Sequence, residues 1–380
     1  MSRLGLRKVS IGAVIALAIL AAVVGFPLVS SASPSQAAVS KHQHPTVNRS
    51  VKNDLSAPLR SIAGKPSNGH GGEADDFPSL KPVKHGKSNH LNPNIQSQIG
   101  PFAAPSTSNN FDGVGNGFTG PQGTFSVASA PPDTNGAVGP QDYVQTVNTD
   151  FAVFNKDPGR GAVGTVRYGP VAINTLWSGF GGLCQTDNNG DPVATYDGIA
   201  NRWVISQFAI ANPDPNYYQC VAVSTTSDPT GSYYRYSFAY SNFPDYPKMG
   251  VWPDAYYETY NLFNASGTTF LGAEDCAFNR AQMLTGAAAT QVCFTTTSYA
   301  SLLPATLDGA TQPPAGAPNY AVALATYTSL GLWKFHVDWN TPANSTFTGP
   351  TSIAIPTFSE ACNGGTCIPQ PATTQQLDSL

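Results

Sequence analysis

One eleven-residue pattern occurs twice in this chain and constrains its fold more than any other feature. Segments 138–148 and 251–261 share the frame V-x-P-x-x-Y-x-x-T-x-N, with five identical residues at the same spacing. An aspartate precedes each copy, Asp133 in the first case and Asp245 in the second. A repeat of this kind indicates that one supersecondary unit is used more than once.

Two weaker copies begin at Asp191 and Pro318, so the units start 53, 60 and 67 residues apart. A blade of four short antiparallel strands takes roughly 40 to 50 residues. The strands expected in the second unit, each bounded by Gly, Pro, Asn or Asp, are 191–197, 202–210, 219–226 and 233–240. The sequence therefore predicts an all-β protein whose residues 129–380 form a propeller-like array of four-stranded antiparallel blades, with a short helical turn at 279–285.

The N-terminal residues 1–38 have the pattern of a secretory signal. Basic residues precede the apolar run 11–29, and small residues follow it. This arrangement is typical of a signal peptide, although a run of 19 residues is also close to the length that spans a bilayer. We therefore expect export, with the segment either cleaved or kept as a membrane anchor. Membrane contact is expected only through this segment, if it is uncleaved.

Residues 39–128 differ from the rest because they are rich in Ser, Pro, Asn, Gly, Lys and His and lack an apolar period. This composition predicts a disordered, basic, low-complexity tail or linker. Residues 1–100 contain 11 Lys and Arg against 4 Asp and Glu, whereas 101–380 contain 8 against 19. The acidic body disfavours binding to nucleic acid, whose phosphates need cationic partners.

Export gives the six cysteines a simple interpretation, because disulfides persist outside the reducing cytosol. Proximity along the chain favours sequential pairs, although six cysteines allow fifteen pairings. The expected disulfides are Cys184–Cys220, Cys276–Cys293 and Cys362–Cys367.

Histidine distribution excludes several reaction classes. Five of the six histidines lie between residues 42 and 90, which leaves His336 alone in the body. Catalysis by Ser-His-Asp or Cys-His would depend on that one residue, and a histidine-rich metal site is excluded. Chemistry based on carboxylates remains.

Two carboxylate patterns suggest a cation site, with Ca²⁺ as the expected ion. The loop from Asp187 through Asn189 to Asp191 resembles the first half of a calcium loop, but its second half lacks the glutamate that such a loop needs. In addition, Asp133, Asp191 and Asp245 open successive units, so they would gather at the mouth of a propeller channel. The alternative is that each aspartate caps an ordinary turn.

A few residues are candidates for catalysis and for ligand binding. Glu258 and Asp254 could form the acid and base of a glycosidase, or Glu258 could be a structural carboxylate between blades. Trp252, Tyr256 and Trp177 could stack on a sugar, although aromatic side chains also fill the interfaces between blades.

The segments 131–156, 187–209, 227–236 and 246–261 resemble a family of uncharacterised secreted bacterial β-propeller proteins, over residues 129–380. The resemblance implies the fold and export but no established activity. Residues 227–234 are distantly similar to the Asp-box turn of sialidase-type propellers, with one extra residue between Asp and Gly. Family members continue with further strands after a segment like 375–380, so this chain is expected to be a C-terminally truncated member with about four blades and the start of another.

The ring of a truncated array would either stay open or be closed by strands from 101–128. For function we expect an exported binding protein whose ligand is a glycan or a cell-surface or extracellular protein. The alternative is a glycoside hydrolase or lyase based on carboxylates.

Overall fold

The structure is a computed structural model of the chain. It describes residues 44–65, 107, 109–127, 131–210, 217–309 and 311–358, and the backbone of 366–369 and 376–378. The predicted signal or anchor segment 1–38 and Cys362 lie outside these residues, so the export signal and the disulfide Cys362–Cys367 stay predictions.

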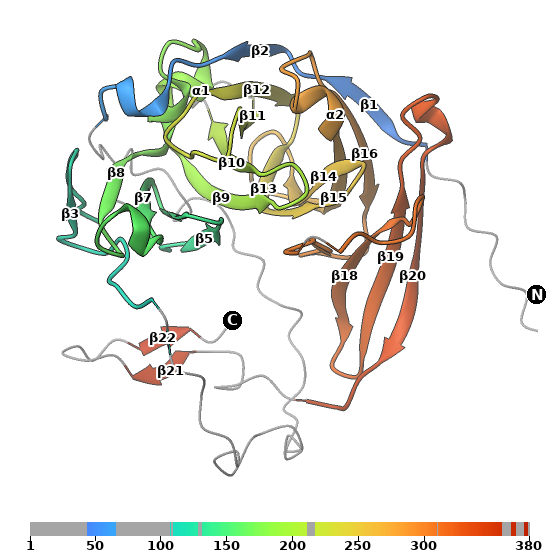
Figure 1. Ribbon diagram of the computed structural model, residues 1–380. Helices are drawn as coiled ribbons and strands as arrows, with labels where there is room; N and C mark the ends of the chain where they lie inside the picture. Colours follow the sequence, from blue (N-terminus) through green and yellow to red (C-terminus); the bar gives the residue numbers. More distant parts are fainter. Residues whose placement is uncertain are drawn as a thin grey trace, which may run out of the picture. The chain divides into compact units, whose positions relative to one another are not determined.

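Four antiparallel sheets follow one another along the chain, and we call them blades 1 to 4 (Figure 1). Blade 1 contains β5 (Asn135–Val138), β6 (Asp142–Val147), β7 (Asp150–Asn155) and β8 (Val166–Ala172). Blade 2 contains β9 (Gly190–Asp197), β10 (Arg202–Ile210), β11 (Tyr217–Ser224) and β12 (Tyr233–Tyr240). Blade 3 contains β13 (Phe243–Val251), β14 (Ala255–Phe263), β15 (Phe270–Asn279) and β16 (Thr290–Thr296). Blade 4 contains β17 (Leu303–Pro304), β18 (Asn319–Thr326), β19 (Ser329–His336) and β20 (Thr346–Ala354).

The first strands of neighbouring blades lie against one another. β5 contacts β9, β9 contacts β13, and β13 contacts β17. The predicted propeller-like array of four-stranded antiparallel blades is therefore confirmed. β20, which is largely exposed, pairs with β19 alone among the described strands.

The remaining elements are short. They include the strand pairs β3 (Thr119–Gly120) with β4 (Gly123–Thr124) and β21 (Thr366–Pro369) with β22 (Gln376–Asp378), and the helices α1 (Leu183–Thr186) and α2 (Arg280–Met283). Asn279 caps α2 by accepting a hydrogen bond from the backbone N–H of Gln282, so the expected helical turn is confirmed. Among the described residues, no helix has the length and apolar character needed to cross a membrane.

The two strong copies of the repeat occupy equivalent positions in blades 1 and 3. Val138 ends β5 and pairs with Tyr143 of β6, just as Val251 ends β13 and pairs with Tyr256 of β14. The turns between these strands also carry the same backbone hydrogen bond, from Gly139 to Asp142 and from Trp252 to Ala255. The shared frame thus encodes the end of a first strand, a turn and a second strand.

The asparagine that ends this frame connects each blade to the next one. Asn148 Oδ1 accepts a hydrogen bond from the backbone N–H of Asp191 at 3.0 Å, and Asn261 Oδ1 accepts one from Ser301 at 2.7 Å. Both donors have left-handed backbones, with φ of 40° at Asp191 and 53° at Ser301. The frame therefore fixes contacts between blades as well as the strands within them.

We expect Asn148→Ala to destabilise the protein by about 1–3 kcal/mol, because it leaves the buried backbone N–H of Asp191 without this acceptor. Equilibrium unfolding in guanidinium chloride measures the loss. Asn344→Ala, at an exposed position, is the matched control. Equal stability of the two variants would contradict the interblade role of Asn148.

Part of the segment expected to be a linker is instead built into the blades. β1 (Thr46–Arg49) pairs with β16 as an outer strand of blade 3, and β2 (Lys52–Leu55) pairs with β12 as an outer strand of blade 2 (Figure 1). β1 is exposed and β2 is exposed at its two ends, so neither strand needs an apolar period. Backbone hydrogen bonds hold both strands, and Asp54 of β2 also pairs with Arg235 at 2.7 Å. The expectation that all of 39–128 lacks structure is therefore wrong for these strands.

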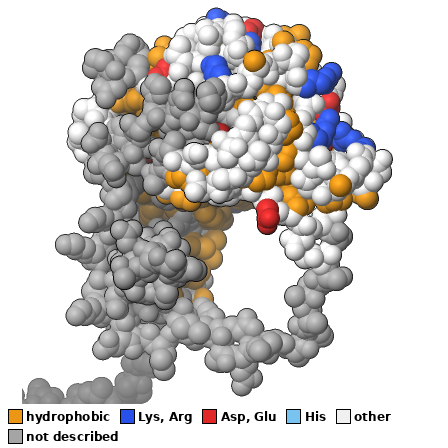
Figure 2. Space-filling model, turned by 90° about the vertical axis from the view of Figure 1, so that its left-hand side faces the viewer, with side chains coloured by type: hydrophobic (Ala, Val, Ile, Leu, Met, Phe, Trp, Pro, Cys, Tyr) orange, Lys and Arg blue, Asp and Glu red, His pale blue; other side chains and the backbone are white. Residues whose placement is uncertain are grey.

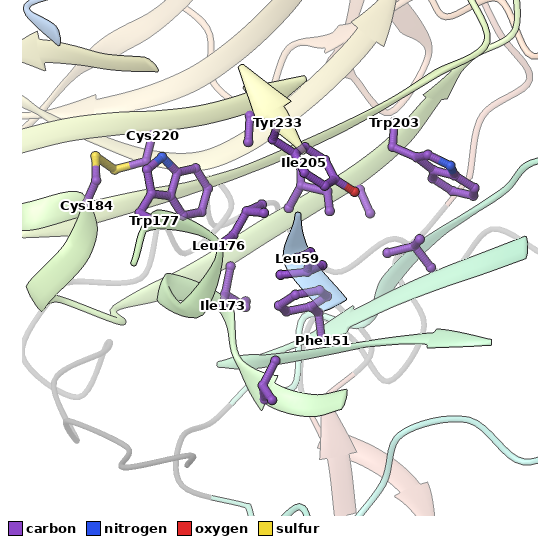
Figure 3. Close-up of a cluster of buried hydrophobic side chains, with 14 of the residues drawn as sticks. Leu59, Phe151, Ile173, Leu176, Trp177, Cys184, Trp203, Ile205, Cys220 and Tyr233 are labelled. Carbon is purple, nitrogen blue, oxygen red and sulfur yellow. A yellow bond between two sulfur atoms is a disulfide. The ribbon is translucent and has the colours of Figure 1, made fainter. Parts of the chain in front are cut away.

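A buried cluster between blades 1 and 2 includes a residue from the same N-terminal segment. Figure 3 shows Leu59 among Phe151 of blade 1, Ile173, which directly follows blade 1, and Ile205 and Tyr233 of blade 2. Leu59 is completely buried, so it acts as a core residue that fixes the N-terminal segment against both blades.

Two of the three expected disulfides are confirmed. Cys184 and Cys220 connect α1 to β11 beside Trp177 (Figure 3), and Cys276 and Cys293 connect the paired strands β15 and β16. Both are compatible with an extracellular protein. Figure 2 shows one face of the molecule on which charged side chains are sparse, in keeping with a chain in which 11% of residues are charged.

Candidate functional site

Three aspartates from successive blades come together beside the first strands. Asp133 precedes β5, Asp191 is the second residue of β9, and Asp245 is the third residue of β13. The charge of Asp191 acts on both of the other carboxyl groups. Because β5, β9 and β13 are neighbours, positions that are far apart in sequence become one local environment.

Two further residues belong to this environment. Tyr246 follows Asp245 directly, and the charges of all three aspartates act on its hydroxyl group and on the ammonium of Lys248. We call Asp133, Asp191, Asp245, Tyr246 and Lys248 the axial cluster. Tyr246 is 40% exposed and Asp133, Asp245 and Lys248 are half-buried, so every member of the cluster except Asp191 is at least partly exposed.

Backbone geometry also sets these positions apart. Asp133, Asp191 and Tyr246 have φ of 36°, 40° and 57°, in the left-handed region. Aspartate enters this region more readily than most residues, but a bulky tyrosine rarely does. Strain of this kind is concentrated at functional sites, which makes Tyr246 notable.

Burial and mutual repulsion raise the pKa values of two of the aspartates. The pKa of Asp133 rises to about 7, because the group is desolvated and its carboxyl hydrogen-bonds that of Asp191, whose charge also disfavours a second negative charge. Asn148 Nδ2 donates a hydrogen bond to Asp133 Oδ2 at 2.8 Å, which opposes the rise. The pKa of Asp245 also rises to about 7, first through desolvation and then through the charge of Asp191.

Asp191 is the most enclosed carboxylate of the cluster. Its exposed fraction is 8%, and its Oδ1 atom has no hydrogen-bond partner within the described part of the chain. A buried acceptor without a partner is costly, so such an atom calls for an explanation. One explanation is that a ligand supplies the missing donor.

Lys248 brings a positive charge into the cluster. Its ammonium donates to the carbonyl oxygen of Pro247 at 3.1 Å and lies 3.6 Å from the centroid of the Tyr246 ring. Desolvation lowers the pKa of Lys248, while the charges of the three aspartates oppose this change. The lysine therefore partly neutralises the carboxylates and also contacts the exposed ring.

The loop expected to form half a calcium site uses its side chains elsewhere. Asp187 accepts a hydrogen bond from the hydroxyl of Thr186, and Asn189 Oδ1 accepts one from the backbone N–H of Ile210 at 2.8 Å. Neither residue contributes to the charges that act on Asp133 or Asp245. The loop itself thus shows the features of a turn.

Among the described residues, only Glu274, Cys276 and Cys293 form a group of three candidate ligand atoms within 4.8 Å of one another. The two cysteines of that group form a disulfide, so they are not available as thiolate ligands. Asp133, Asp191 and Asp245 do not form such a group of three ligand atoms within 4.8 Å. Calcium binding by them stays a prediction.

Glu258 does not reach the surface, which argues against the expected pairing with Asp254. It lies in β14, the second strand of blade 3, and it is completely buried. It accepts hydrogen bonds from Ser206 Oγ and Gln219 Nε2, both at 2.9 Å, and from the Tyr260 hydroxyl at 2.6 Å. Glu258 therefore joins blades 2 and 3, as in the alternative considered for it.

The three aromatic candidates for ligand binding are also buried. Trp177 and Tyr256 are 0% exposed and Trp252 is 6% exposed. Trp252 donates through Nε1 to the carbonyl of Ala317, and the Tyr256 hydroxyl donates to Asp197. These rings fill the core and present no free face to a sugar, so the expectation that they stack on a ligand is wrong. Tyr246 is the exposed ring that sequence reasoning missed, although it directly follows the aspartate that opens its unit.

Comparisons with known proteins add little beyond the fold. No family model matches the chain, and no curated protein matches it. Two solved structures are similar to it: exo-β-1,3-galactanase from Phanerochaete chrysosporium with galactose, at 10% identity and a TM-score of 0.34, and a variant of that enzyme with β-1,3-galactotriose, at 11% and 0.33. Each match covers 64% of this chain and 53% of the other, so the chain spans about half the length of these neighbours.

Proposed function

We propose that the protein binds a glycan at the axial cluster. The observation that supports this most is the Asp191 carboxylate, which is buried yet keeps one oxygen without a partner among the described residues. Sugar hydroxyls are donors that carboxylate oxygens accept, and saccharide sites combine such polar groups with an aromatic face. Asp133, Asp245 and the exposed Tyr246 supply the other parts of such a site.

Spacing of the carboxyl groups favours binding over hydrolysis. The two carboxyl groups of a glycosidase lie roughly 5 to 9.5 Å apart, on either side of the sugar. Asp133 and Asp191 interact directly enough for Asp191 to raise the pKa of Asp133, which leaves little room for a sugar between these two carboxyl groups. A glycoside hydrolase remains the second candidate, because Asp245 has a pKa of about 7 and interacts with Asp191 through charge without a hydrogen bond.

We further propose that the chain is exported through residues 1–38 and belongs to the family of secreted bacterial propellers that its motifs resemble. The two disulfides support an extracellular location, since such bonds are rare in the reducing cytosol. A surface protein is the alternative ligand in that location.

Binding of the full chain to an array of oligosaccharides tests the proposed function. We expect a subset of glycans to bind and Asp191→Asn to weaken that binding about tenfold, since one charge-assisted hydrogen bond is worth about 1.4 kcal/mol or more. Asp112→Asn is the matched control, because Asp112 is exposed and is not among the charges that act on the cluster, and it should bind like the wild type.

Release of reducing ends from the bound glycans distinguishes the two candidate functions. Binding without turnover supports a binding protein, whereas turnover abolished by Asp191→Asn supports a hydrolase. An array on which the wild type binds nothing, or on which Asp191→Asn binds equally well, would contradict a glycan site at the axial cluster.

A further inference from the structure

Tyr246 is an exposed aromatic residue held in an unusual position. Its backbone has φ of 57°, which a tyrosine rarely adopts, and its side chain stays 40% exposed. The Lys248 ammonium lies 3.6 Å from the ring centroid and therefore covers one face of the ring. A cation on one face fixes the ring orientation and leaves the opposite face as the one available for stacking.

The surroundings of this ring are acidic. Asp133, Asp191 and Asp245 all act on Tyr246 through their charges, and Lys248 is the cation that opposes them. Residues 101–380 carry 8 Lys and Arg against 19 Asp and Glu, so the wider field has the same sign. A ligand with a carboxylate or sulfate would meet like charges here, which disfavours its binding.

We propose that the axial cluster is a saccharide subsite in which Tyr246 is the stacking platform and the three aspartates admit uncharged sugars while rejecting acidic ones. Sugar hydroxyls donate to the half-buried carboxyl groups of Asp133 and Asp245 and to Asp191 Oδ1, which has no partner among the described residues, while the apolar face of the sugar ring packs on Tyr246. Lys248 is a positioning residue that holds the aromatic ring. This inference rests on the proposed function and adds the class of ligand and the residue that determines it.

Substitution of Tyr246 tests the platform. We expect Tyr246→Asn to weaken binding of the array-identified glycan about tenfold, because it removes the ring while asparagine tolerates the left-handed backbone. Tyr246→Phe keeps the ring and should bind within about threefold of the wild type, a difference of less than 1 kcal/mol. Thermal unfolding of both variants shows whether a loss of binding comes from a loss of folding. Unchanged binding by a folded Tyr246→Asn variant would overturn the role of this residue.

Matched pairs of oligosaccharides test the selectivity. Gluco-, manno- and galacto-oligosaccharides are each compared with the corresponding uronic acid oligomers at the same ionic strength. We expect the neutral member of each binding pair to bind at least about tenfold more tightly at pH 8, above the pKa of about 7 of Asp133 and Asp245. Asp245→Asn should narrow that difference, because it removes one of the repelling charges. Raised salt should narrow the difference as well.

The outcomes separate this inference from the proposed function. Glycan binding that Asp191→Asn weakens but that favours the acidic member of each pair, or that Tyr246→Asn leaves intact, overturns the inference alone. An array on which the wild type binds no glycan overturns both. A preference for neutral sugars, together with a loss of binding when the ring of Tyr246 is removed, supports both the inference and the proposed function.

Discussion

We expect the melting temperature of this protein to fall by about 10 °C when the pH rises from 5 to 9. In blade 3, Glu258 and Asp275 are completely buried and Glu274 is half-buried. Desolvation raises the pKa of Glu258 and Glu274 to about 7 and that of Asp275 to about 8. One pKa unit corresponds to about 1.4 kcal/mol, and about 1 kcal/mol shifts the melting temperature of a domain this large by about 2–4 °C. A loss of about 3 kcal/mol, which is less than the three shifts would give if they added fully, is therefore already enough for the expected change.

The direction of this stability change follows from the pH range in which each carboxyl group keeps its proton in the folded and in the unfolded chain. In the unfolded chain Asp275 loses its proton near its ordinary pKa of 3.8, whereas in the fold it keeps the proton up to about pH 8. Between these values unfolding releases a proton, so rising pH favours the unfolded state. The stability that Asp275 contributes is fully present below its unfolded pKa and is lost as the pH rises through the folded one. Glu258 and Glu274 act in the same direction over a window that ends near pH 7.

Asp275→Asn shows how much of the pH dependence of the melting temperature comes from the titration of Asp275. Both carboxyl oxygens of Asp275 lack a hydrogen-bond partner among the described residues, so the charged form has no stabilising contact there. The variant cannot titrate, and we expect a visibly smaller fall in melting temperature between pH 5 and 9 than in the wild type. Asp112→Asn, which is exposed, should leave the slope unchanged. A melting temperature that rises with pH, or identical slopes for wild type and Asp275→Asn, would contradict this account.

Much of the blade architecture could be predicted from the sequence because the signals were local. Two strands of blade 2, β10 and β12, begin and end where expected, since turn residues bound each of them. The repeated frame marked equivalent strands in blades 1 and 3. The disulfides Cys184–Cys220 and Cys276–Cys293 followed from proximity along the chain.

Features that depend on distant pairing could not be predicted in this way. β1 and β2 belong to blades whose other strands lie well over 100 residues later, and backbone hydrogen bonds leave no side-chain pattern to detect. The two roles considered for Glu258 could not be separated from the sequence, because only the packing of blade 3 against blade 2 brings it to Ser206. In the axial cluster, the aspartates were identified from the repeat, but Lys248 and Tyr246 became part of the site only through the fold.

A buried ion pair between blades 2 and 3 leads to the last prediction. Asp197 ends β9 and is completely buried, and Arg280 in α2 donates to it through Nε at 2.6 Å and Nη2 at 3.0 Å. The Tyr256 hydroxyl donates to the same carboxylate at 2.8 Å, and so do the backbone N–H groups of Ile199 and Ala200 at 3.0 and 2.9 Å. The carboxylate is thus fully paired only while Arg280 is present.

We expect Arg280→Leu to destabilise the protein by about 3–5 kcal/mol, because removing one partner leaves a buried charge without its counter-ion. Replacing both partners, as in Arg280→Leu with Asp197→Leu, should cost less than the two single substitutions added together, since no lone charge remains buried. Arg60→Ala is the matched control: its ion pair with Asp228 is solvent-exposed, at 60% and 38% of the two side chains, and should contribute less than about 1 kcal/mol. Guanidinium chloride unfolding of the four variants measures all of these values. Equal losses for Arg280→Leu and Arg60→Ala would show that the Asp197–Arg280 pair does not hold blades 2 and 3 together.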